Sequence, residues 1–156
     1  MDRLLKFWSL PRREKQFLCE AGTLLLLSNL SIKAIAFRHI DNFLHTRWKD
    51  APRDSDHADD IKLVKLSVSR AANLLPSKSL CLSRSIAEFI MLRRRGIPAV
   101  MYAGVKFSEN SSLSAHAWVH SGREAANGNS ENCAYTSLVT IGHEPIITDP
   151  PRKSLQ

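Results

Sequence analysis

The chain has 156 residues, 44% hydrophobic and 24% charged, so it is long enough for one well-packed domain and too apolar for a disordered protein. Lysine and arginine outnumber aspartate and glutamate by 22 to 15, which fits either a polyanionic partner or simply a basic surface. The longest apolar stretch, 17–27, contains Glu20 and is too short to span a membrane, and the charged N-terminus has no signal-peptide pattern, so we expect a cytoplasmic protein.

The first third of the chain has a helical pattern. Apolar residues recur at helical spacing from Pro11 to about Trp48, and proline suits a first helical turn. A break near Ser28–Ser31 is predicted, followed by a second amphipathic helix over Ile32–Leu44. The polar stretch 49–60 then predicts a loop.

Two further helices are expected after this loop. Apolar residues at helical spacing predict the first over 61–74, and Pro76 ends it. Ser77 and Ser79 are both candidate N-caps for the second, which is expected to continue to Arg95. Gly96 and Pro98 then form a strong stop signal.

From residue 99 onward the periodicity changes from helical to alternating. Strands are predicted over Ala99–Val105, Leu113–His120 and Tyr135–Ile141, with a loop at 108–112 and a hairpin turn at Ser121–Gly122. Helices followed by antiparallel strands predict an α+β fold. We expect a helical region over residues 1–50, packed on a core over residues 57–150.

Cys81 is the first candidate for chemistry. Cys19, Cys81 and Cys133 are too few and too widely spaced for a disulfide framework or a metal site, so no metal or cofactor is expected. If Ser79 caps the helix, Cys81 lies in its first turn, where free backbone N–H groups and the helix dipole favour a thiolate. The alternative is a buried structural cysteine. Cys19 and Cys133 are expected to be packing residues.

His116 is the candidate base. Alternation along Leu113–His120 places His116 and Trp118 on one face, and Leu113, Ala115, Ala117 and Val119 on the face expected to pack inward. A histidine on a strand that crosses the start of the Cys81 helix supplies the base that a cysteine nucleophile needs. The alternative is a structural histidine. Trp118 is expected either to wall the cleft or to pack in the core.

Three sequence blocks together carry a family resemblance. They are CLSRS from Cys81 to Ser85, LRRRGIPAVMYAGV from Leu92 to Val105, and AHAWVHSGR from Ala115 to Arg123. In this order and spacing the chain resembles the transglutaminase-like cysteine proteases of lasso-peptide biosynthesis, which are leader peptidases. The resemblance is strong over 75–127 and looser in the N-terminal helices.

The resemblance implies a Cys–His–Asp triad on a fold related to papain and transglutaminases, a helix packed on an antiparallel sheet. Cys81 matches its nucleophile and His116 its general base. The acid departs from the pattern, because Asn127 stands where the family usually has aspartate. Asparagine can still fix the tautomer of the histidine, as in papain-type enzymes. Other residues remain open for this role: Asn129, Glu131, Asn132 and Asp149.

The resemblance also implies partners. We expect a lasso precursor peptide as substrate, a separate leader-recognition domain protein and, less directly, the lasso cyclase, with no nucleic acid and no membrane span. Acyl transfer to an amine is an alternative to hydrolysis, and a basic helical protein that binds nucleic acid is the alternative outside the enzymes. Cations in the last turn of a helix suit its dipole, but the same arginines are also candidates for contact with the leader: Arg93, Arg94 and Arg95. Further basic candidates for docking a partner are Arg12, Arg13, Lys62, Lys65 and Arg70.

Overall fold

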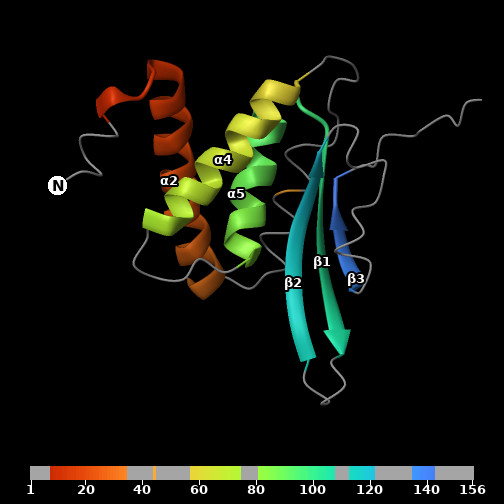
Figure 1. The fold of residues 1–156 in the computed structure, drawn as a ribbon. Coiled ribbons are helices and arrows are strands. Elements are labelled where there is room, and N and C mark those ends of the chain that lie inside the picture. The colour runs from red at the N-terminus through yellow and green to blue at the C-terminus, as the bar shows by residue number, and fades with distance from the viewer. Residues whose placement is uncertain are drawn as a thin grey trace, which may run out of the picture.

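The chain folds into a layer of helices packed on one antiparallel sheet (Figure 1). The computed structural model describes residues 8–34, 44, 57–74, 81–107, 113–121 and 135–142. The α+β prediction is confirmed. The elements in chain order are α2 (Arg12–Ala34), α4 (Ala58–Leu74), α5 (Cys81–Arg94), β1 (Ala99–Phe107), β2 (Leu113–Ser121) and β3 (Thr136–Ile141).

Helix α2 is longer than its sequence suggests. The backbone N–H of Lys15 donates to the carbonyl of Pro11, so the proline directly precedes the first turn. The predicted break at Ser28–Ser31 is wrong, because the helix continues to Ala34. Ser28 is buried, and Asn29 Oδ1 accepts a hydrogen bond from Ser83 of α5 at 2.6 Å. Contacts between helices therefore stabilise polar residues that would otherwise favour a helix end. Residues 35–43, which make up most of the predicted second helix, lie outside the described residues.

Helix α4 begins at Ala58, three residues before the start predicted from the apolar pattern. The carbonyl of His57 accepts the first helical hydrogen bond, from the N–H of Ile61. Asp59 and Asp60 lie in the first turn, where carboxylates interact favourably with the helix dipole. The apolar periodicity missed this turn because it is polar. Pro76 and the candidate caps Ser77 and Ser79 lie outside the described residues.

Helix α5 ends at Arg94, one residue before the end predicted from the sequence, and the stop signal at Gly96 is confirmed. Gly96 has a φ of 72°, a left-handed conformation that glycine adopts without a steric penalty. Its N–H donates to the carbonyl of Arg93, and the N–H of Ile97 donates to that of Leu92. This is a Schellman motif, and it leads the chain directly into β1.

The sheet has the order β2-β1-β3, with both outer strands antiparallel to β1. The register pairs Tyr102 with Trp118 and Gly104 with His116. Of the predicted hairpin turn, Ser121 is the last residue of β2, and Gly122 lies outside the described residues.

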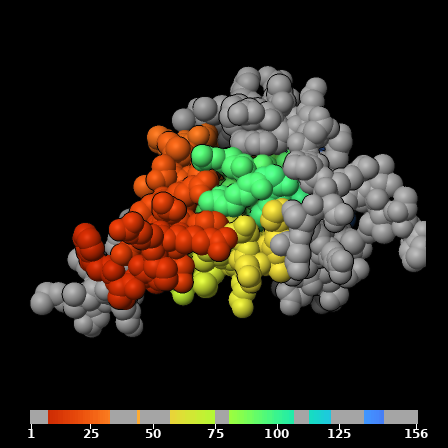
Figure 2. All heavy atoms as spheres, turned by 90° about the horizontal axis from the view of Figure 1, so that it is seen from above, coloured from red at the N-terminus to blue at the C-terminus, as the bar shows by residue number. Residues whose placement is uncertain are grey.

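The core lies between the three helices and the inner face of the sheet. Helix α2 packs against both α4 and α5, and α5 packs against β1 and β2. Figure 2 shows α2, in red to orange, beside α4 and α5. Helix α5 therefore lies between the other two helices and the sheet. The largest fully buried apolar side chains are Leu25, Leu44, Val64, Phe89, Met91, Leu92, Ile97, Val100, Met101 and Ile141.

Replacing Gly22 by alanine is expected to raise the free energy of unfolding by about 0.5–1 kcal/mol. Gly22 lies inside α2, and a Cβ at this position would meet no atom within 4 Å. Gly96→Ala is the matched control and should lower stability by about 1–2 kcal/mol, because its φ of 72° is left-handed. Urea unfolding measures the free energy of unfolding of both variants. A Gly22→Ala variant that is less stable than wild type would contradict the prediction for Gly22.

Candidate active site

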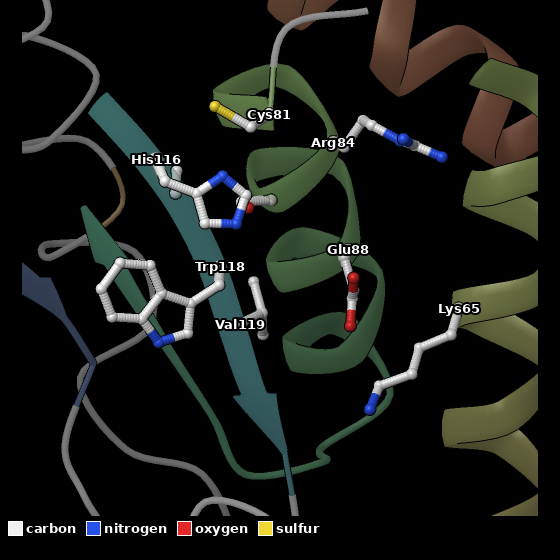
Figure 3. Close-up of a pocket in the computed structure, with 9 residues that line it drawn as sticks. Lys65, Cys81, Arg84, Glu88, His116, Trp118 and Val119 are labelled. Carbon is white, nitrogen blue, oxygen red and sulfur yellow. The ribbon is translucent and has the colours of Figure 1, made fainter. Parts of the chain in front are cut away.

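Cys81 and His116 line the same pocket, between the helices and the edge strand β2 (Figure 3). The pocket has a volume of about 390 Å³ and is open to solvent. Cys81 and His116 lie at one end of it, and Lys65 and Glu88 lie at the other. The lining residues are Lys65, Cys81, Arg84, Ser85, Glu88, His116, Ala117, Trp118 and Val119.

Cys81 is the first residue of α5, which confirms the prediction that it lies in the first turn of this helix. Its thiol is not in a disulfide, and its side chain is partly exposed. The backbone N–H groups of a first helical turn have no carbonyl partner within the helix. A thiolate on Cys81, and an anion formed by attack of this thiolate, would therefore lie at the positive end of the α5 dipole.

His116 reaches the pocket from the edge of the sheet. Ala117 and Val119 pack toward α5, and Figure 3 shows the His116 ring turned across the strand edge into the pocket. In the described part of the chain, no hydrogen bond joins Cys81 and His116. Catalytic hydrogen bonds often form only once substrate is bound. The prediction that Leu113 and Ala115 pack inward is wrong, because both are exposed at the end of β2 that extends beyond the helices.

Asn127 lies outside the described residues, and so do all four alternatives, Asn129, Glu131, Asn132 and Asp149. The orienting role of Asn127 therefore stays a prediction.

Trp118 is half-buried and lines the pocket, which favours a role as a wall of the cleft over a role as a core aromatic residue.

The structure adds pocket residues that the sequence reasoning missed. Ser85 and Glu88 follow Cys81 at helical spacings of four and seven, so α5 presents all three on one face. Ser85 is 5% exposed and belongs to the pocket floor. Lys65, predicted as a docking residue, reaches the pocket from α4. Helical spacing from Cys81 could have identified Ser85 and Glu88, whereas Lys65 comes from another helix and required the tertiary structure.

The three consecutive arginines at the end of α5 are largely structural. Arg93 is only 6% exposed. Arg95 pairs with Glu20 of α2, donates to the Met91 carbonyl at 2.8 Å and stacks over the Phe17 ring at 4.0 Å. Arg94 pairs with Glu20 at 3.3 Å, but most of its side chain is exposed. Contact of Arg93 or Arg95 with a leader peptide is therefore disfavoured, and of the three Arg94 is best placed for a partner.

Carboxylates neutralise part of the remaining basic surface. Arg13 pairs with Asp60, and Arg70 pairs with Glu14 at 3.2 Å, so these ion pairs link α2 to α4. The leucines of α2 lie partly in the core and partly on the surface. Leu25 is buried, whereas Leu26 and Leu30 are exposed.

Cys19 is exposed on α2, so its prediction as a packing residue is wrong, and Cys133 lies outside the described residues. Within the described residues, no three His, Cys, Asp or Glu side chains come close enough to hold a metal ion. None of the described helices is sufficiently long and apolar to cross a membrane.

The chain matches the model of a known protein family. The family model of the transglutaminase-like superfamily matches residues 24–140, about three quarters of the chain. Neither the curated proteins nor the solved structures give a match. Members of this superfamily are generally cysteine proteases and transferases, in agreement with a cysteine at a helix start beside a histidine on a strand. From the matched length and this arrangement, the chain belongs to the transglutaminase-like superfamily.

Proposed function

We propose that the chain is a cysteine peptidase that removes the leader from a ribosomally made lasso precursor peptide. The observation that carries the proposal is the shared pocket of Cys81, at the start of α5, and His116, on β2. Membership of the superfamily supports the cysteine chemistry. The resemblance of the three sequence blocks to lasso leader peptidases supports the choice of substrate.

The proposed reaction begins with proton transfer from the Cys81 thiol to His116. The thiolate attacks the carbonyl carbon of the leader–core bond, and His116 returns the proton to the leaving amine as the C–N bond breaks. The leader half is left as a thioester on Cys81. Water, deprotonated by His116, then hydrolyses the thioester and releases the leader as a free acid. We assign one oxyanion donor to the backbone N–H of Cys81 and the orienting role to Asn127.

The pocket has room for several residues of an extended peptide. Glu88 lies seven positions after Cys81, which corresponds to about 10 Å along a helix axis. An extended chain covers this distance in about three residues. A substrate residue about three positions from the cleaved bond would then lie between Lys65 and Glu88, which carry opposite charges.

The test is cleavage of the precursor in the presence of the separate leader-recognition domain. Wild-type protein is expected to cut at one site, with products identified by mass spectrometry. Omitting the recognition domain should slow cleavage, because we propose that this partner presents the leader. We also infer that the cyclase uses the freed amine. Cleavage at many sites, or in an unrelated peptide at the same rate, would contradict the assigned substrate.

Acyl transfer is the second candidate, supported by the transferases within the superfamily. A thioester on Cys81 can react with an amine in place of water. Carrying out the reaction in H₂¹⁸O with an added primary amine separates the two outcomes. Incorporation of ¹⁸O into the leader carboxylate indicates hydrolysis, whereas a leader amide as the main product would replace the peptidase proposal by acyl transfer.

Replacing Asn127 by aspartate tests the third member of the triad. A carboxylate stabilises an imidazolium better than an amide does, so Asn127→Asp is expected to cleave at least as fast as wild type. Asn127→Ala is expected to lower kcat by about 10- to 100-fold with little change in KM. Asn129→Ala and Asn132→Ala are the matched controls, and a larger loss in either control would move the assignment to that residue.

A further inference from the structure

The His116 ring contacts two aromatic side chains that have no role in the proposed reaction. The imidazole stacks on the Trp118 indole, with ring centroids 6.0 Å apart and planes 15° apart. On another side it meets the Tyr135 ring, at 5.3 Å and 39°. Trp118 and Tyr135 also contact each other, at 6.1 Å. These separations lie in the range in which aromatic pairs attract each other.

The Trp118 indole is itself held in place. It stacks on Tyr102 of β1 at 5.6 Å and 15°, a consequence of the register that pairs these two residues. It also lies over Gly104, where a Cβ would come within 3.2 Å of the Trp118 ring and within 2.6 Å of the Thr136 carbonyl oxygen. A larger residue at position 104 would displace the β3 backbone and press on the indole. Gly104 therefore leaves the space that the indole needs beside the imidazole.

We propose that Trp118 is a positioning residue for His116, and this inference rests on the proposed function. The described residues give His116 no hydrogen bond to Cys81, and ring contacts hold the imidazole in addition to the orienting role proposed for Asn127. Stacking on Trp118, with Tyr135 on another side, holds the imidazole where it lines the pocket with Cys81. The electron-rich indole face also attracts the imidazolium that forms when His116 takes the thiol proton.

Tryptophan fluorescence tests this geometry without any substrate. The chain has three tryptophans, so Trp8→Phe with Trp48→Phe leaves Trp118 as the only one. An imidazole stacked on an indole quenches its emission, so His116→Gln is expected to raise the emission of Trp118. Equal emission with and without the imidazole would overturn the proposal.

Alkylation of Cys81 by iodoacetamide tests the effect on chemistry. Cys19 is exposed and would also react, so the assay needs a Cys19→Ser, Cys133→Ser background. Trp118→Leu is expected to slow alkylation near neutral pH about 10-fold, and Trp118→Phe, which keeps a flat ring, less than 3-fold. Trp8→Leu, at a tryptophan 73% exposed, is the matched control and should leave the rate unchanged.

A double-mutant cycle separates positioning from a general structural role. In a His116→Ala background, Trp118→Leu should have no further effect on alkylation, because the side chain that it positions is gone. An equal loss with and without His116 would overturn the proposal. If fluorescence and alkylation behave as expected but no precursor is cleaved, the peptidase proposal fails while the positioning of His116 by Trp118 stands.

Discussion

Cys81→Ala is expected to lower the rate of leader cleavage by on the order of 10⁴-fold or more, with stability close to that of wild type. The loss is large because the reaction proceeds through a thioester on this sulfur, and alanine leaves no nucleophile. Stability should change little, because Cys81 is partly exposed at the first residue of α5 and is not in a disulfide. Single-turnover cleavage followed by mass spectrometry measures the rate and shows whether an adduct accumulates on wild-type protein.

The His116→Ala variant supplies the control for this prediction. Residues that act as one catalytic unit give non-additive losses, so the Cys81→Ala, His116→Ala double variant should be no slower than Cys81→Ala alone. Cys19→Ser changes an exposed thiol outside the pocket and should cleave at the wild-type rate. Full activity of Cys81→Ala would end the peptidase proposal, and full activity of His116→Ala would require another base.

Arg95→Met is expected to lower the free energy of unfolding by about 2–3 kcal/mol. Its guanidinium pairs with Glu20, donates to the Met91 carbonyl and stacks over Phe17, and only 22% of its side chain is exposed. Methionine keeps most of the apolar stem but loses the charge-assisted hydrogen bonds that tie the end of α5 to α2. Urea unfolding measures this change.

Arg94→Met is the matched control at the neighbouring position, the last residue of α5. Arg94 shares Glu20, but its side chain is 58% exposed, so its loss should cost less than about 0.5 kcal/mol. Well below the unfolding temperature, Arg95→Met should leave the KM for the precursor unchanged. A tenfold rise in KM without loss of stability would instead place Arg95 in the leader-binding surface.

Much of the fold could be predicted because local patterns and tertiary packing agree. Gly96 ends α5 in a left-handed conformation, and the alternating runs form β1, β2 and β3. The failures had two causes, one in contacts between distant parts of the chain and one in a local pattern. The break expected at Ser28–Ser31 does not form, since Asn29 finds its partner in Ser83, 54 positions away. The start of α4 was missed because its first turn is polar and gives no apolar signal.

The sequence by itself determined the α+β class, the place of Cys81 in a first helical turn, and the choice of His116 as the candidate base. These depend on periodicity, turn signals and motif spacing, which are local in the chain. Only the tertiary structure brought Lys65 and Glu88 into one pocket with them and assigned Arg95 to a contact between helices. Only the tertiary structure shows that His116 stacks on Trp118 and that the Trp118 ring lies against Gly104. Such contacts depend on strand register and on which helix faces meet, and side-chain packing across the whole chain decides both.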